Sequence, residues 1–389
     1  MYDFDTVIDR RGTASVKWES DPPSSGGRDV LPLWVADMDF AAPREILQAI
    51  EHRAAHGVFG YTLEPPSYLE AVAQWLANRH GWTVQPDWVV SSPGVLPSIS
   101  TALLAFTQPG DGVIIQPPVY YPFGLRIAMA GRQVVQNPLV QRRGLWEMDF
   151  EHLERVIDGR TRALILCSPH NPCSRVWDRD SLARLALLCA RRGILIFSDE
   201  IHCDLVMKGS RHVPAAVSCP EAAAITITFV SPTKTFNLAG IAGSFTIIAD
   251  SALRLRFQEQ ARALWMGLGN PLSIAAVEAA YRQGSAWLDE LLAYIGGNRD
   301  LLAGFLEQRL PEVHLAPLEG TYLAWLDMRG LGMSDEEITD RLRNRAAVRL
   351  DEGRKFGAGG NGFQRINLAC PRSILREALE RMAGALGKR

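Results

Sequence analysis

The feature that most constrains this chain is a series of short apolar runs separated by segments with helical periodicity. The runs have little polar alternation, which is typical of strands buried on both faces of a sheet. They lie within the first two thirds of the 389 residues. The expected strands are Trp88–Ser91, Val113–Ile115, Ala163–Cys167, Ile194–Phe197, Ile225–Val230 and Phe245–Ile248.

Helical patterns connect these runs. One spans residues 96–106, and another is expected to begin at Asp180 as its N-cap and to stop at Gly193. Strand–helix alternation of this kind predicts an α/β fold with a mostly parallel sheet covered by helices. The last third differs, because residues 271–306 are mainly helical in pattern. Three short strands are expected after them, at Tyr322–Leu326, Ala347–Leu350 and Arg365–Leu368.

A chain of 389 residues is too long for one small domain and predicts two. We expect residues 46–285 to form the large domain and residues 286–389 a smaller C-terminal α/β domain. Residues 1–45 are expected to contribute to the small domain and to the entrance of the active site. Asp21–Arg28, with the sequence DPPSSGGR, has the composition of a surface turn.

Charge and composition exclude several classes of partner. The net charge is −2, so no global field attracts nucleic acid or an anionic membrane. The acidic N-terminus lacks the apolar region of a secretory signal, and no apolar run reaches the roughly 18 residues of a membrane span. The six cysteines are scattered and are expected to be reduced thiols. We expect a cytoplasmic protein with no nucleic-acid or membrane partner.

Polar residues cluster where the expected strands end. In open parallel sheets, ligands bind beyond the carboxyl ends of the strands. Gly94 follows the first strand, Asn171 the third and Lys234 the fifth, while Asp199 ends the fourth. Their convergence predicts one site at this edge of the sheet.

Lys234 and Asp199 have the chemistry of cofactor-binding residues. A lysine just past a buried strand is a candidate Schiff-base nucleophile, because burial lowers the pKa of an amine. The flanking hydroxyls of Ser231 and Thr233 are candidate phosphate ligands. A carboxylate at the end of an apolar strand needs a cationic partner, and the protonated pyridine nitrogen of pyridoxal phosphate is such a partner. The plain alternatives are an exposed loop lysine and a helix-capping aspartate.

The other candidates are also ambiguous one by one. Gly94 and Val95 open a helix whose first amides suit a phosphate, although a simple glycine turn has the same sequence. Tyr120 is an aromatic that suits stacking on a pyridine ring or ordinary packing. Asn171 fits a cofactor-oxygen donor or an Asn–Pro turn. Arg365 lies in an apolar strand, where its partner is a substrate carboxylate or an internal acid.

The order of these motifs resembles the fold-type I aminotransferases and, within them, the cystathionine β-lyase-like (MalY/PatB) C–S lyase subfamily. The likeness runs nearly from end to end. It is carried by WVADMDF at Trp34–Phe40, GYT at Gly60–Thr62, SPHNP at Ser168–Pro172, SDEIH at Ser198–His202, TKTFNLAG at Thr233–Gly240 and RINLACPR at Arg365–Arg372.

The resemblance implies that the large domain binds pyridoxal 5'-phosphate as a Schiff base on Lys234, with Asp199 against the ring nitrogen. Tyr120 stacks on the ring, and His202 replaces the tyrosine that many aminotransferases place near the 3'-oxygen, where Asn171 also donates. Arg365 binds the substrate α-carboxylate, beside Ala36 and Tyr120. The resemblance also implies that the phosphate lies in a cup formed by Gly94, Val95, Ser231 and Thr233. It further implies a homodimer with shared active sites, in which Tyr61 of one subunit contacts the phosphate bound by the other.

The implied reaction is β-elimination from cystathionine or a related cysteine S-conjugate, which yields a thiol, pyruvate and ammonia, with Lys234 as general base. The first alternative is an aminotransferase that uses the same residues, and a bulky biosynthetic conjugate is another possible substrate. A non-catalytic regulatory protein on this fold is a further alternative. Two departures bear on substrate preference: Ser174 stands where the family usually has glycine, and Leu238–Ser244 is unusually rich in glycine.

Overall fold

The computed structural model describes residues 2–20, 27–241, 243–267 and 269–387. Its largest element is a seven-stranded sheet in the order β2-β10-β9-β8-β7-β3-β4. Strands β9, β8, β7, β3 and β4 are parallel, and β10 runs antiparallel to both β2 and β9. The strands are β2 Val89–Ser92, β3 Gly112–Ile115, β4 Gln133–Gln136, β7 Thr161–Cys167, β8 Leu195–Asp199, β9 Thr226–Val230 and β10 Ser244–Ile247.

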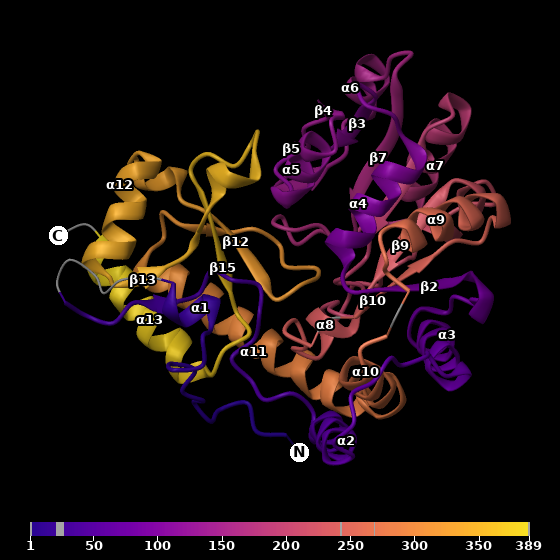
Figure 1. Ribbon diagram of the computed structural model, residues 1–389. Coiled ribbons are helices and arrows are strands. Elements are labelled where there is room, and N and C mark those ends of the chain that lie inside the picture. The colour runs from indigo at the N-terminus through magenta and orange to yellow at the C-terminus, as the bar shows by residue number, and fades with distance from the viewer. Residues whose placement is uncertain (1, 21–26, 242, 268, 388–389) are drawn as a thin grey trace.

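Helices cover both faces of this sheet (Figure 1). Successive side chains of a strand point to opposite faces, so Ile165 packs in one apolar layer and Leu164 in another. The layer that contains Ile165 includes α4 Val95–Phe106, α5 Pro122–Met129 and α9 Ser251–Ala263. The layer that contains Leu164 includes α6 Phe150–Val156 and α7 Arg179–Arg192. Burial on both sides explains why these strands are almost wholly apolar.

A second, smaller sheet lies in the other lobe of the molecule (Figure 1). It has the order β11-β12-β15-β14 and consists of β11 His314–Leu315, β12 Leu323–Asp327, β15 Phe363–Asn367 and β14 Asp351–Glu352. The long helix α11 (Ser285–Arg309) and the C-terminal helix α13 (Arg372–Leu386) pack against each other beside it. Near the N-terminus, β1 (Leu31–Pro32) pairs in parallel with β13 (Val348–Arg349).

The remaining helices complete the two lobes. Helix α10 packs against both α2 and α3 beside the large sheet (Figure 1). Their bounds are α1 Val16–Glu19, α2 Arg44–Ala55, α3 Pro66–His80, α8 Pro232–Thr235, α10 Pro271–Gln283 and α12 Asp335–Asp340, and a small hairpin pairs β5 Val140–Arg142 with β6 Leu145–Glu147. No helix in the described ranges is long and apolar enough to cross a membrane.

The predicted α/β fold is confirmed, and the six predicted strands of the large sheet lie within two residues of the observed ones. Two details were wrong, the N-cap of α7 and the missed strand β4. Helix α7 is capped by Asp178, whose side chain accepts a hydrogen bond from the Ser181 amide at 2.7 Å, and Asp180 lies inside the first turn. The edge strand β4 was missed because it is mostly exposed and has polar ends. The strand predicted at Ala347–Leu350 is present as the shorter β13, which pairs with β1 outside the four-stranded sheet. Most of the predicted turn at Asp21–Arg28 lies outside the described residues.

Candidate active site

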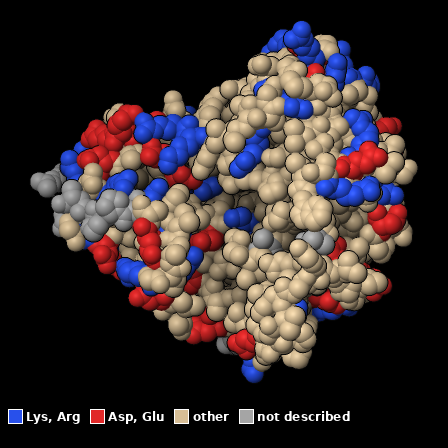
Figure 2. Space-filling model, viewed as in Figure 1, with Lys and Arg blue, Asp and Glu red and all other residues tan. Residues whose placement is uncertain are grey.

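A cavity of about 240 Å³ opens at the carboxyl ends of the central strands. Figure 2 shows this face of the molecule hollowed between the two lobes, with basic side chains inside the hollow. Nine of the predicted site residues line the cavity, and they come from six separate stretches of sequence. They are Ala36, Gly94, Val95, Tyr120, Asn171, Asp199, His202, Thr233 and Lys234.

Lys234 lies on the short helix α8, which begins directly after strand β9. The side chain is partly buried, and its Nζ donates a hydrogen bond to the Ala36 carbonyl. The pKa of this amine is lowered to about 8, chiefly by desolvation and also by Arg365, whereas Asp37 and Asp199 oppose the shift. An amine in this state is neutral in a useful fraction of molecules near neutral pH, as a nucleophile or base requires.

Asp199 is the last residue of β8 and is buried. Its Oδ1 accepts one hydrogen bond, from the Ile201 amide at 3.1 Å. The pKa of this carboxyl is raised to about 7, chiefly by desolvation and also by the neighbouring Glu200, while the Ile201 amide and Lys234 oppose the rise. A buried carboxyl in a cavity with so little compensation is a binding position for a cationic group of a ligand.

His202 is buried on the same turn, three residues beyond Asp199. Desolvation lowers the pKa of its imidazole to about 3, and the charges of Lys234 and Arg365 act in the same direction. The ring is therefore neutral, and its Nδ1 has no partner in the described residues. It can act as a hydrogen-bonding group for a ligand oxygen without adding charge to the cavity.

Arg365 lies at the centre of β15 and is buried beside the cavity. Its Nη1 donates to Asn171 Oδ1 at 2.9 Å, and its Nη2 donates to Asp351 Oδ2 and to the Trp34 carbonyl, both at 2.7 Å. The internal ion pair with Asp351 that the sequence left open is therefore present. Nε has no hydrogen-bond partner in the described part of the chain, so a donor remains for a ligand carboxylate.

The expected phosphate cup is only partly as predicted. Gly94 precedes α4, and the backbone amides in the first turn of this helix have no acceptor within the helix. Thr233 lines the cavity, but the Ser231 hydroxyl points to the Gly243 carbonyl at 2.6 Å and the Thr233 hydroxyl at 2.8 Å. Tyr61 is 92% exposed and lies outside the cavity of this single chain.

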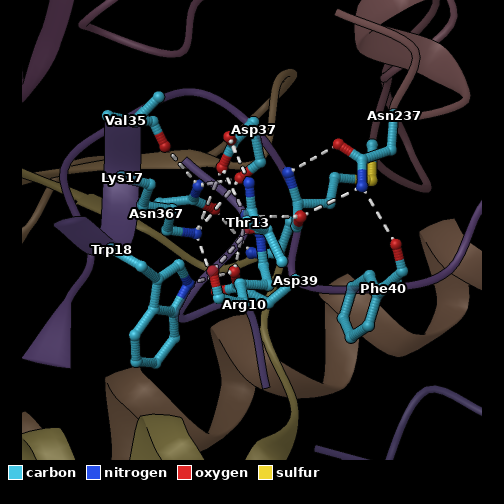
Figure 3. A network of polar contacts seen from close by, with 12 residues as sticks. Arg10, Thr13, Lys17, Trp18, Val35, Asp37, Asp39, Phe40, Asn237 and Asn367 are labelled. Carbon is cyan, nitrogen blue, oxygen red and sulfur yellow. Dashed lines mark hydrogen bonds and ion pairs between the residues drawn. The ribbon is translucent and has the colours of Figure 1, made fainter. Parts of the chain in front are cut away.

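The segment Trp34–Phe40, whose Ala36 lines the cavity, is held by a network that the sequence did not reveal (Figure 3). Asn237 donates to the carbonyls of Met38 and Phe40, and Asn367 donates to those of Val35 and Asp37. The same segment supplies the Ala36 carbonyl that accepts from Lys234 and, at 2.9 Å, from the Tyr322 hydroxyl. Side chains from both lobes thus fix the position of this carbonyl.

The outer part of this network is a cluster of charges in which Lys17 and Asp39 are buried and Arg10 and Asp37 are half-buried (Figure 3). Lys17 Nζ lies 2.7 Å from Asp39 Oδ2, and their side chains are 0% and 3% exposed. Arg10 contacts Asp37 through both terminal nitrogens and Asp39 through Nη1. Trp18 Nε1 donates to Asp39 at 2.9 Å. Two aspartates of the WVADMDF motif therefore anchor the segment, and no pattern in the sequence pairs them with residues near the N-terminus.

Ser174, where the resemblance leads us to expect glycine, adopts a left-handed backbone conformation with φ +59°. This conformation is unfavourable for a residue with a side chain. The Ser174 hydroxyl donates to the Leu323 carbonyl, and its amide donates to the His170 carbonyl at 2.7 Å. The turn therefore keeps a glycine-like shape, and Asn171 faces the cavity.

Comparison with known proteins assigns the chain to a family. Residues 28–382 match the family model described as aminotransferase class I and II, so the chain belongs to that family. It is 42% identical to the cystathionine beta-lyase PatB of Bacillus subtilis, over 98% of this chain and 99% of the relative. It is 30% identical to the arginine–pyruvate transaminase AruH of Pseudomonas aeruginosa, over 92% of this chain and 90% of the relative.

Solved structures agree with this assignment. The crystal structure of cystalysin from Treponema denticola, which contains pyridoxal 5'-phosphate, superimposes with a TM-score of 0.95. The two sequences are 38% identical, and the match covers 99% of each chain. A PLP-bound C–S lyase from Staphylococcus hominis superimposes with a TM-score of 0.92 at 31% identity, over 100% of each chain.

Proposed function

We propose that this enzyme is a pyridoxal-phosphate-dependent carbon–sulfur β-lyase that cleaves cystathionine or a related cysteine S-conjugate to a thiol, pyruvate and ammonia. The observation that carries the proposal is the placement of the Lys234 amine and the Asp199 carboxyl in one cavity, with the Arg365 guanidinium beside it. The 42% identity to a cystathionine beta-lyase along nearly the whole chain favours this reaction over others of the family.

The cofactor is pyridoxal 5'-phosphate, and the residues present fit it. Asp199 is a buried carboxyl that needs a cation, and the protonated ring nitrogen supplies one. His202 has an unpartnered Nδ1 that suits a ring oxygen, with Asn171 nearby. The N-terminus of α4 at Gly94 and Val95, together with Thr233, suits the phosphate. Lys234 is the amine that bonds to the cofactor.

The reaction assigns separate tasks to the protein's own groups. Arg365 binds the substrate carboxylate through Nε, the guanidinium nitrogen that has no hydrogen-bond partner in the described residues. Lys234, released when the substrate amine takes its place, would then remove the α-proton as general base from its position beside the Ala36 carbonyl. When bound, the cofactor supplies an electron sink for the pair left on the α-carbon, so that a thiolate on the β-carbon can leave. Asp199 stays anionic and keeps the ring nitrogen protonated.

The alternative is an aminotransferase that returns the proton to the cofactor instead of expelling a thiolate. The same residues serve both reactions, and the 30% identity to AruH keeps this alternative open. Purified enzyme is incubated with cystathionine and with S-alkyl cysteines in the absence of any 2-oxo acid. Repeated turnover with release of pyruvate and thiol is expected, whereas strict dependence on an added 2-oxo acid would refute the lyase assignment.

We further propose a cytoplasmic homodimer in which Tyr61 reaches the partner's phosphate. Support comes from large exposed apolar side chains around the contact between Thr62 and Gly269, since such a patch marks an interface. They are Val58, Phe59, Tyr61, Leu63 and Trp265, which are 63%, 56%, 92%, 85% and 79% exposed. Light scattering should give twice the chain mass of 42.9 kDa, and Leu63→Arg should give the monomer. A wild-type monomer would contradict this proposal.

The division into a large domain of residues 46–285, a small domain of residues 286–389 and an N-terminal segment of residues 1–45 also remains a proposal. The pairing of β1 with β13 supports an association of the N-terminal segment with the small lobe.

A further inference from the structure

Two buried acid–imidazole pairs lie behind the cavity. Glu200 Oε2 is 2.8 Å from His212 Nε2, and Asp204 Oδ1 is 2.7 Å from His80 Nε2. The two imidazole rings meet edge to face, with centroids 5.4 Å apart. The four side chains are at most 5% exposed. The two pairs thus lie side by side in the core and touch through their imidazole rings, and we call them together the acid–imidazole chain.

The acid–imidazole chain is connected to both Asp199 and Lys234. Its first acid, Glu200, follows Asp199 directly in sequence. Its other acid, Asp204, accepts a hydrogen bond at 2.7 Å from the hydroxyl of Thr235, which follows Lys234. None of its four members touches the cavity, so the proposed mechanism gives them no task.

The acid–imidazole chain contains two buried carboxylates, Glu200 and Asp204. The negative charge of each must be stabilised by hydrogen bonds or by a nearby positive charge. Glu200 also accepts from neutral groups, namely the Ser198 hydroxyl and the Ala215 amide, and Asp204 accepts from Trp75 and Thr235.

The other titratable groups close to Asp204 are Cys203 and Tyr281. Burial raises the pKa of both, and Asp204 raises it further, so both stay neutral. Within the described residues, the basic groups paired with these two acids are the imidazoles of His212 and His80.

We propose that His212 and His80 carry positive charge that neutralises Glu200 and Asp204, and that the acid–imidazole chain thereby positions Lys234 and keeps Asp199 anionic against the ring nitrogen of pyridoxal phosphate. The inference rests on the cofactor binding proposed above but not on carbon–sulfur cleavage. His212, His80, Glu200 and Asp204 are positioning residues, because they act through Asp199 and Thr235.

The direction of the effect follows from electrostatics. An uncompensated anion at Glu200 repels a second anion at Asp199 and favours a proton on the Asp199 carboxyl. In that state the proton lies on Asp199, and the ring nitrogen of the cofactor is unprotonated. His212→Gln should produce this state, since glutamine can keep the hydrogen bond to Glu200 but carries no charge. The double variant E200Q/H212Q removes both charges and should restore the wild-type balance.

The test is 15N NMR of enzyme loaded with pyridoxal phosphate that carries the label at the ring nitrogen. The wild type, Glu200→Gln and the double variant should give the protonated ring nitrogen, and His212→Gln should shift the signal toward the unprotonated form. Turnover of His212→Gln should fall about tenfold at a KM changed less than about threefold, with recovery in the double variant. His314→Gln, at an exposed histidine, is the control.

The outcomes separate this inference from the proposed function. A wild-type signal in His212→Gln would overturn the inference. A double variant that is as impaired as His212→Gln would also overturn it, because that result would indicate a role of His212 in packing alone. Circular dichroism checks folding, and if His212→Gln does not fold, the same signal is measured in His80→Gln. A protonated ring nitrogen in a wild type without lyase activity refutes only the reaction, whereas failure to bind the cofactor refutes both.

Discussion

Replacement of Arg365 by lysine tests the assignment of the substrate-binding residue. Lysine keeps the positive charge beside Asp351 but loses the planar edge that can hold both oxygens of a carboxylate. Loss of one charge-assisted hydrogen bond costs about 1.5–3 kcal/mol, which corresponds to a decrease of roughly 10- to 150-fold in kcat/KM. The unpartnered Nε of Arg365 is the donor that this change removes.

The assay follows pyruvate release from cystathionine with the wild type and Arg365→Lys, together with the absorbance of the bound cofactor. Most of the loss should appear in KM, and cofactor binding should be retained, because the guanidinium contacts Asn171, Trp34 and Asp351 rather than Lys234. Arg354→Lys is the matched control, since Arg354 is 44% exposed and pairs with Glu336 and Glu352. A change in kcat/KM of less than about threefold in Arg365→Lys would refute the assignment.

Three further predictions follow from the described contacts. Lys234→Ala should abolish both turnover and the absorbance of the lysine-bound cofactor, and a variant that kept both would exclude this residue as the anchor. Lys17→Met should lower the free energy of unfolding by about 3 kcal/mol in urea titrations, because it leaves the 3% exposed Asp39 without its closest cation; no change would show that Arg10 suffices. In cofactor-free protein, the pKa of Asp199 is raised from 3.8 to about 7, so between these pH values the folded state binds a proton that the unfolded state has lost. The free energy of unfolding should therefore fall as the pH rises from 3.8 to about 7. Asp199→Asn should remove that decline in thermal melts, and a parallel decline in the variant would contradict it.

The large sheet could be predicted from the amino-acid sequence alone. Its strands are buried on both faces, so their side chains must be apolar throughout, and the runs are recognisable without any structure. The site at the carboxyl ends was predictable for the same reason, because parallel strands bring Asn171, Asp199 and Lys234 to one edge. Exposed elements were less predictable: β4 at the sheet edge has no apolar run.

The surroundings of these residues depend on long-range packing in the folded chain. The contacts of Ala36 with Lys234 and of Asp204 with His80 join residues 198 and 124 positions apart. The pairing of such distant side chains depends on how helices and lobes pack, and apolar periodicity carries no information about it. The same holds for the Ser231 hydroxyl, which packing directs to Gly243. The chain thus encodes its sheet and the order of its motifs locally, whereas the charge balance around Lys234 and Asp199 arises from long-range packing.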